Sequence, residues 1–158
     1  MSEEPRDAGG SPPVYLYPGQ VVADAEGQRV STILGSCVAV CLWDPERRVG
    51  GMTHYLLPHA TQGAQGSPRF AEPAIRQLIS RLTGLGAHPG RLVAKLFGGS
   101  THGVFSSNGF HVGARNVAVA RDLLRAADIP IESEDVGGSR GRKVVFATSD
   151  GLAWVKLL

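Results

Sequence analysis

The sequence predicts a single-domain α+β sandwich with largely antiparallel or mixed sheets and two main helices. Three observations indicate this fold class. Short apolar segments separated by Gly- and Pro-containing turns recur along the chain, as is typical of paired strands. Only two segments repeat apolar residues at helical spacing, which is too few for a doubly wound sheet. The 158 residues are 42% apolar and 19% charged, which suits one globular domain with a buried core.

The N-terminal part is expected to contain a tail followed by short strands. Residues 1–13 are rich in Gly, Pro, Ser and acidic groups and are predicted to form a flexible tail, so that residues 14–158 form the domain. Residues 14–17 and 20–24 are predicted to be short edge strands on either side of a turn at Pro18-Gly19.

A central strand is predicted at residues 37–44. It follows another predicted strand at residues 29–34, with a break at Gly35. Residues 38–43 are uniformly apolar, so neither face of this strand is expected to be solvated. The sequence therefore places this strand in the middle of a sheet.

This central strand is expected to form a hairpin with residues 49–57. The turn signal is Asp44-Pro45-Glu46-Arg47. A two-residue loop at its centre would pair the two ends of the turn and place Cys37 directly opposite His54, on one face. A register shift of two residues would leave the two side chains diagonal on that face, and a shift of one would separate them.

The second half of the chain is expected to supply both helices and the closing strands. Residues 58–68 form a polar, Gly-rich loop that is a candidate lid or substrate-side flap. Helical spacing predicts one helix that starts near Glu72-Pro73 and stops at Gly84 and Gly86, and a second at residues 113–127. The inner face of the second helix is expected to hold Val117, Ala120, Leu123, Leu124 and Ala127. Strands are predicted at residues 92–97, 131–136, 143–148 and 152–157.

Cys37 and His54 are the side chains most able to carry covalent chemistry. A cysteine-dependent acyl transfer needs a thiol that attacks a carbonyl carbon and an imidazole that takes the thiol proton and later passes it to a leaving amine. Gly35 permits close approach just before the nucleophile, and the backbone N–H groups of residues 35–37 are candidate oxyanion donors. The alternative interpretation is a buried core thiol and a core histidine bonded to a backbone carbonyl.

A third group is needed to orient the imidazole. Ser31 and Thr32 are the nearest hydroxyls upstream, and strand alternation would point only one of them at the site. Either is also compatible with ordinary strand-face polarity, so the choice between them stays open at the level of the sequence.

The remaining reactive side chains receive structural interpretations. Cys41 lies about 13 Å from Cys37 along an extended strand, so no disulfide is expected and both thiols are predicted to be free. Two thiols also make a poor zinc site, and no metal or cofactor is predicted. His88, beside Pro89, is expected in a turn, and His59 is expected to be solvated. Surface positions are also expected for His102 and His111, with a place at the border of a site as the alternative. The basic cluster of Arg140, Arg142 and Lys143 is expected to be a solvated turn, with contact to an acidic partner as the alternative.

Composition and charge argue against several classes of protein. The formal charge of +2, the 6% aromatic content and the lack of a sustained basic stripe give little support to nucleic-acid binding. No apolar run approaches the roughly 20 residues needed to cross a bilayer, and the polar N-terminus does not resemble a signal peptide. A soluble cytoplasmic protein without direct membrane insertion is expected.

An ordered set of short motifs extends from about residue 30 to the C-terminus. The motifs are Leu34-Gly35-Ser36-Cys37-Val38, Asp44-Pro45, Gly50-Gly51-Met52-Thr53-His54 with Leu57-Pro58, Ala94-Lys95-Leu96-Phe97-Gly98-Gly99, Gly113-Ala114-Arg115-Asn116, and Gly137-Gly138 with Gly141-Arg142-Lys143-Val144-Val145-Phe146. In this order and spacing, they resemble those of the chemoreceptor glutamine deamidase family, CheD.

The resemblance implies a catalytic Cys–His–Thr triad, carried here by Cys37, His54 and a hydroxyl upstream of the cysteine. By gapless counting the family's threonine falls at Ser31, with Thr32 adjacent. The resemblance also implies the α/β sandwich shared with bacterial toxin deamidases, and chemistry that needs no metal or organic cofactor.

The implied activity is hydrolysis of specific glutamine side chains of methyl-accepting chemotaxis receptors to glutamate, with release of ammonia through a thioester on Cys37. The implied partners are the cytoplasmic domain of a chemoreceptor and, in some bacteria, a CheC-type phosphatase. One alternative is a non-catalytic chemotaxis protein that binds and regulates such a phosphatase or a receptor. Another is a cysteine peptidase, which would use the same atoms on a backbone amide.

Overall fold

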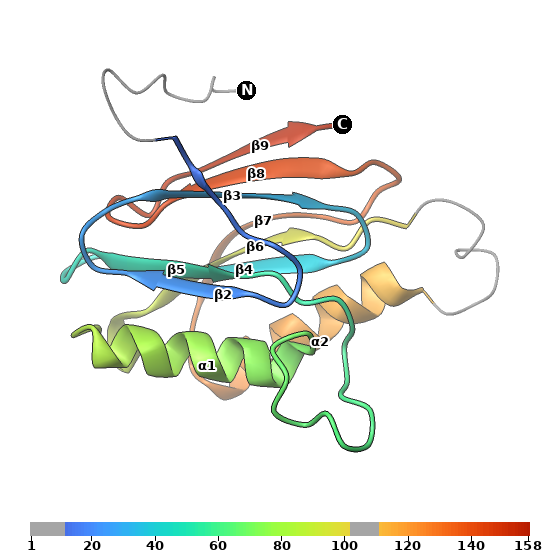
Figure 1. Cartoon of the computed structure of the whole chain (residues 1–158), viewed down its shortest axis with the longest axis horizontal. Coiled ribbons are helices and arrows are strands. Elements are labelled where there is room, and N and C mark those ends of the chain that lie inside the picture. The colour runs from blue at the N-terminus through green and yellow to red at the C-terminus, as the bar shows by residue number, and fades with distance from the viewer. Residues whose placement is uncertain (1–11, 102–110) are drawn as a thin grey trace.

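The computed structural model describes residues 12–101 and 111–158, and these residues form three layers (Figure 1). A four-stranded sheet packs on a five-stranded sheet, and two helices cover the other face of the five-stranded sheet. One apolar cluster lies between the helices and the five-stranded sheet, and a second lies between the two sheets. The predicted α+β sandwich is therefore confirmed.

The four-stranded sheet combines segments from the two ends of the domain. Its order is β1-β3-β8-β9, with β1 parallel to β3 and the other neighbours antiparallel. The strands are β1 (Val14–Tyr15), β3 (Arg29–Leu34), β8 (Arg142–Ala147) and β9 (Ala153–Leu157).

The five-stranded sheet carries the helices. Its order is β2-β5-β4-β6-β7, and only β6 and β7 are parallel, because the second helix crosses between them. The strands are β2 (Val21–Asp24), β4 (Val38–Asp44), β5 (Val49–Thr53), β6 (Val93–Gly98) and β7 (Ile131–Val136). The helices are α1 (Ala71–Gly84), the short 3₁₀ helix η1 (Pro89–Arg91) and α2 (Val112–Ala126).

The two predicted N-terminal edge strands are both found at sheet edges. They belong to different sheets, however, because β1 borders β3 whereas β2 borders β5. The turn at Pro18-Gly19 therefore carries the chain from one layer to the other.

β4 occupies the centre of the five-stranded sheet, as its uniformly apolar sequence predicts. Val38, Val40 and Leu42 belong to the cluster beneath the helices. Ala39 and Cys41 belong to the cluster between the sheets. Both faces of the strand are buried, which explains why the apolar residues do not alternate with polar ones.

The adjacent strand β5 contains a glycine where neighbouring elements approach closely. A Cβ atom at Gly51 would lie 2.2 Å from the carbonyl oxygen of Val22 and 2.6 Å from Cδ1 of Leu78. These distances are far below van der Waals contact, so only glycine lets β2 and α1 pack here against β5.

The β4–β5 hairpin differs from the predicted one by two residues in register. Asp44 pairs with Val49, so the connecting loop is residues 45–48 and not a two-residue turn. The Asp44 side chain causes the difference, because its Oδ1 accepts hydrogen bonds from the N–H groups of Glu46 and Arg47. Arg48 closes the longer loop in a left-handed conformation, with φ of 57°.

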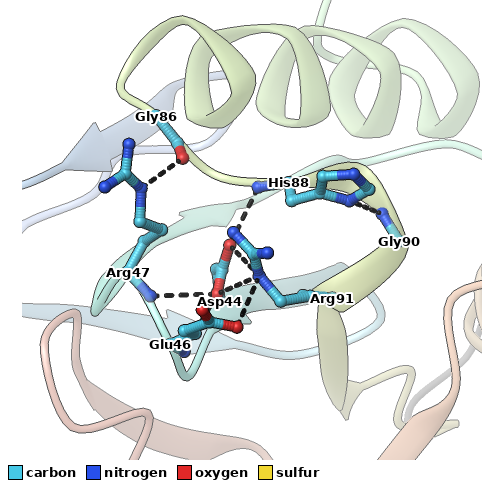
Figure 2. A network of polar contacts seen from close by, with 7 residues as sticks. All are labelled: Asp44, Glu46, Arg47, Gly86, His88, Gly90 and Arg91. Atoms are coloured by element: carbon cyan, nitrogen blue, oxygen red, sulfur yellow. Dashed lines mark hydrogen bonds and ion pairs between the residues drawn. The ribbon is translucent and has the colours of Figure 1, made fainter.

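The Asp44 carboxylate also joins this hairpin to the segment before β6 (Figure 2). It is completely buried. It accepts a hydrogen bond from the His88 N–H at 2.8 Å and forms an ion pair with Arg91 at 3.4 Å. Burial alone would raise the pKa of this carboxyl, but the hydrogen bonds from His88, Arg47, Glu46 and Arg91 outweigh it and lower the pKa. His88 itself lies in a turn, as expected, and caps η1.

Both predicted helices are present, with one error on the inner face of the second. Val117, Ala120 and Leu124 are buried and Leu123 is half-buried, but Ala127 is exposed. The reason is that α2 ends at Ala126, and the chain turns away at Asp128, whose φ is 56°. Neither helix in the described segments has the length and apolar composition needed to span a membrane.

Some expectations fall on residues that the structure does not describe. They concern residues 1–11 of the predicted tail, His102, and the rest of the segment up to residue 110. The segment at residues 58–68 consists of bends and turns, and its role as a lid stays a prediction.

Candidate active site

A hydrogen bond joins Thr32 on β3 to His54, which follows β5. Thr32 Oγ1 lies 2.7 Å from His54 Nδ1, and both residues are buried. Alternation along β3 turns Thr32 toward the inter-sheet cluster, together with Val30 and Leu34. Ser31 therefore points to the opposite face of the four-stranded sheet, and the structure brings Thr32 and not Ser31 to the histidine.

The hydrogen-bond pattern determines which nitrogen of His54 carries the proton. The Thr32 hydroxyl has a single hydrogen, and Oγ1 also lies 2.7 Å from the carbonyl oxygen of Leu16, which can only accept. The hydroxyl thus donates to Leu16 and accepts from His54 Nδ1–H. In the neutral ring this leaves Nε2 with its lone pair, so Nε2 is the basic atom.

His54 is held in a position where a charge is unfavourable. Its ring is buried, its Nε2 has no hydrogen-bond partner among the described residues, and burial lowers its pKa to about 4. Its backbone is fixed by the N-terminal segment, since Gly19 N–H donates to the His54 carbonyl at 2.7 Å and His54 N–H donates to Gln20 at 3.4 Å. At neutral pH the imidazole is therefore uncharged and able to accept a proton.

Cys37 lies at the start of β4, on the same side of the sheet as His54. Its half-buried side chain packs against the inter-sheet cluster. Because Val38 pairs with Tyr55, Cys37 is diagonal to His54 rather than directly opposite, so the predicted direct opposition was wrong. The shift of two residues keeps both side chains on one face, and the thiol makes no hydrogen bond to Nε2 in this structure.

The electrostatic environment keeps the thiol protonated at rest. Burial raises the pKa of Cys37, and the backbone N–H of the same residue partly offsets this effect. The neutral thiol and the neutral imidazole are thus the resting forms, and a proton must move when the sulfur reacts.

All three carbonyl groups of the loop that holds the nucleophile are bonded. Gly35 accepts from the N–H of Ser100, Ser36 accepts from the side chain of Asn116, and Cys37 accepts from the N–H of Gly99, each at 2.9 Å. The last of these bonds depends on the glycine that precedes Gly99. A Cβ atom at Gly98, whose φ is 107°, would lie 2.2 Å from the Cys37 carbonyl oxygen.

Asn116 on α2 is the part of the site that sequence reasoning did not assign. It is fully buried, and its Nδ2 donates to the carbonyl oxygens of Ser36 and Leu56, both at 2.9 Å. The available signal was its position within the buried stripe of α2, next to Val117 and between Gly113 and Ala120. A polar residue in such an apolar stripe requires a partner.

The other reactive side chains lie where they have structural roles or contact solvent. Cys41 is buried, burial raises the pKa of its thiol, and both cysteines are free. His59 and His111 are exposed. Within the described ranges, no group of three or more His, Cys, Asp or Glu residues is arranged to hold a metal ion.

Arg142 does not lie in a solvated turn as expected. Its guanidinium is buried and donates to the carbonyl oxygens of Gly98 and Gly137 at 2.9 and 2.8 Å, and it pairs with Asp135 at 3.2 Å. The reason is that its side chain reaches from the start of β8 to the carbonyl at the end of β6 and to the carbonyl just after β7, which both accept from it.

The fold and the site together identify the class of protein: a two-sheet α+β domain with a thiol, an imidazole and a hydroxyl between its sheets. Such a set has the groups needed for acyl transfer through a thioester. The chain belongs to the CheD chemotactic sensory transduction family, whose family model matches residues 56–157.

Several relatives of known name support this membership over most of the chain. A protein of Anaeromyxobacter dehalogenans named probable chemoreceptor glutamine deamidase CheD 1 is 48% identical over 151 residues, which span 95% of this chain and 87% of that protein. A protein of Sulfurimonas denitrificans named probable chemoreceptor glutamine deamidase CheD is 37% identical over 143 residues, spanning 90% and 92% of the two chains.

Among solved structures, the chain resembles the Bacillus licheniformis hypothetical protein YfiH. The TM-score is 0.37 and the sequence identity is 14%, with 71% of this chain and 46% of that chain covered. A likeness this weak supports no conclusion about function.

Proposed function

We propose that this protein is a protein-glutamine deamidase that converts glutamine side chains of chemoreceptor cytoplasmic domains to glutamate. The names of its relatives support the substrate class. The single observation that carries the chemistry is the state of His54, which shares a face of the sheet with Cys37: its Nδ1 is bonded to Thr32, while its buried Nε2 has no hydrogen-bond partner among the described residues. We also propose that the protein acts in the cytoplasm, where these receptor domains lie.

In the first step, the Cys37 sulfur attacks the side-chain Cδ of the substrate glutamine. His54 Nε2 takes the thiol proton as the S–C bond forms, and the carbonyl oxygen becomes an oxyanion. The ring then carries a positive charge, and Thr32 Oγ1 stabilises it by accepting from Nδ1–H. The hydroxyl itself does not ionise, because its own proton is directed at Leu16.

In the second step, the tetrahedral intermediate collapses to a thioester. His54 Nε2–H gives its proton to the departing nitrogen, which leaves as ammonia. A water molecule then attacks the thioester carbonyl and loses a proton to His54 Nε2. The imidazolium returns that proton to the sulfur as glutamate is released, so the enzyme is restored without a cofactor.

A non-catalytic role is the second candidate, and one observation favours it. The Cys37 thiol and His54 Nε2 share no hydrogen bond in the structure, so a substrate would have to bring them together. A chemotaxis protein that only binds a receptor or a CheC-type phosphatase would not need that pairing. A CheC-type phosphatase also remains a candidate partner of the active enzyme.

The deciding experiment measures ammonia release and peptide masses on a purified chemoreceptor cytoplasmic fragment. We expect the wild type to convert specific glutamines to glutamate, and Cys37→Ala to lose at least about 10⁴-fold in rate while keeping its melting temperature. Cys41→Ala is the matched control, because it removes the other thiol. If well-folded wild type converts no glutamine, yet binds receptor or phosphatase as tightly as Cys37→Ala does, the binding role replaces the enzymatic one.

A further inference from the structure

We infer that Asn116 is a positioning residue that orients the peptide unit between Ser36 and Cys37 and thereby aims the Cys37 N–H at the oxyanion of the reaction. This inference rests on the proposed function. It adds a residue on α2 that acts through the nucleophile loop and that touches neither the substrate nor the sulfur.

The first argument is where the Asn116 side chain lies. The last bridge between β4 and β5 joins Val38 and Tyr55, with N–H to O distances of 3.1 and 3.0 Å. Beyond it the two chains separate, because the N–H of Leu56 turns away to donate to Arg69 at 2.8 Å. Asn116 Nδ2 enters this opening and donates to one carbonyl from each side, Ser36 and Leu56.

The second argument is the geometry of a trans peptide. In each planar trans unit the C=O and the following N–H point in opposite directions, and the described residues contain no cis peptide bond. The Ser36 carbonyl points at Asn116, so the Cys37 N–H points away from α2. The Gly35 carbonyl is likewise held by Ser100, which fixes the direction of the Ser36 N–H.

The third argument is what lies on the side to which these N–H groups point. Ser36 is exposed and Cys37 is half-buried, so a substrate can reach the loop that carries these N–H groups. The Cys37 N–H lies beside its own sulfur, close enough to lower the pKa of the thiol. A carbonyl carbon attacked by that sulfur places its oxygen near this N–H, and a fixed donor at such a position stabilises the transition state.

The residue type fits the task. Two carbonyl oxygens face one atom, so that atom must carry two hydrogens and no negative charge, and an amide nitrogen meets both needs. The backbone at this position is itself held, because the Tyr55 hydroxyl donates to the Asn116 carbonyl at 2.5 Å. Tyr55 therefore offers a matched control, since Tyr55→Phe removes a buried hydrogen bond to the same residue and leaves the amide contacts in place.

The test compares a reaction that forms an oxyanion with one that does not. Asn116→Ala and Asn116→Ser are prepared with Tyr55→Phe and wild type, and folding is checked by thermal melting. Deamidation of the receptor fragment and inhibition by a glutamine-site peptide aldehyde both place an oxygen at the oxyanion position, since the aldehyde adds to the thiol as a hemithioacetal. Alkylation of Cys37 by iodoacetamide needs only the sulfur, and Cys41→Ala removes the second thiol from that assay.

We expect Asn116→Ala to lower kcat of deamidation by about 10²-fold and to weaken aldehyde binding by a similar factor, the size expected for a misaligned oxyanion donor. Asn116→Ser keeps one donor and should lie in between, and it carries the test if the alanine variant does not fold. Alkylation rates should stay close to wild type in all variants, and Tyr55→Phe, which keeps both amide contacts of Asn116, should lose less kcat than either Asn116 variant.

Two results would overturn the inference. One is a folded Asn116 variant with wild-type kcat and aldehyde affinity. The other is an alkylation rate that falls as far as kcat, which would mean that the substitution displaces the sulfur or His54 as a whole. Failure of the proposed function looks different, because the wild type itself would then release no ammonia and the aldehyde would not bind through Cys37.

Discussion

The two ends of the β4–β5 hairpin bury polar groups in opposite ways. At the turn end, the Asp44 carboxylate is fully buried and accepts from the N–H groups of Glu46, Arg47 and His88 (Figure 2). At the open end, His54 is buried to the same degree, yet its Nε2 has no partner among the described residues.

This difference separates a group that stabilises the fold from one that is available as the base of the proposed reaction. A buried polar atom with all its partners contributes to stability, whereas one without a partner is destabilising by roughly 1–3 kcal/mol. Asp44 belongs to the first kind and retains its negative charge because its pKa is lowered. His54 belongs to the second kind and remains neutral because burial lowers its pKa to about 4.

The largest effect is expected from removing the satisfied group. Asp44→Ala leaves three backbone donors without their acceptor and removes the buried one of the two carboxylates that pair with Arg91, so it should lower the free energy of unfolding by about 3–5 kcal/mol. Urea unfolding measures this loss, and kcat at low temperature should not change. Glu46→Gln is the control at the exposed rim, where the ion pair with Arg91 is solvated. A loss below 1 kcal/mol for Asp44→Ala would contradict the structural role.

The second effect is a pH dependence of stability that comes from His54. Its pKa is about 4 in the folded state and 6.5 ordinarily, so the unfolded chain binds the proton first as the pH falls. The free energy of unfolding should therefore decrease by about 3 kcal/mol between pH 6.5 and pH 4.

Urea unfolding at several pH values tests this prediction, with His54→Gln as the variant that lacks the titrating group. The difference between the two curves should slope upward with pH across this window. Asp44 contributes in a separate range, because its lowered pKa protects the fold above its ordinary value of 3.8 and loses that effect only in stronger acid. Parallel curves for wild type and His54→Gln would show that the histidine titrates normally.

The smallest effect concerns the hydroxyl that orients His54. Thr32→Val removes the acceptor for Nδ1–H and should reduce kcat by about 10²-fold, or roughly 2.7 kcal/mol, while Thr32→Ser should recover most of it. Ser31→Ala alters the opposite face of the strand and should leave kcat near wild type. Steady-state deamidation kinetics distinguish the two, and a Ser31→Ala defect as large as that of Thr32→Val would reverse the assignment.

The fold could be predicted where a local pattern determines it. The central position of β4 follows from a strand that is apolar on both faces, and the two helices follow from their apolar spacing. The assignment of β1 and β2 to different sheets could not be predicted, because it depends on pairing with β3 and β5. The hairpin register depended on the Asp44 side chain and on the left-handed conformation of Arg48, a residue type that gives no signal for it.

The sequence predicted that Cys37 and His54 lie on one face of the sheet, but it did not predict the groups around them. Alternation along β3 does not reveal from the sequence which hydroxyl faces the other sheet, because Ser31 shares its face with the apolar, exposed Ile33 and is itself buried, as is Thr32 on the face of Val30. Asn116 contacts the carbonyl of Ser36 across 80 residues of sequence. Its place in an apolar stripe indicates that it needs a partner, but no local pattern indicates which one.

The acceptor for the Thr32 hydroxyl is the carbonyl oxygen of Leu16, a main-chain atom that every amino acid possesses. An apolar substitution at position 16 should therefore leave this acceptor in place, provided that the segment keeps its path beside β3, whereas a polar one would disturb the inter-sheet cluster in which the Leu16 side chain is buried. A fusion or truncation that displaces this segment by a single residue would remove the acceptor of the Thr32 hydroxyl and so alter the hydrogen bonding of His54.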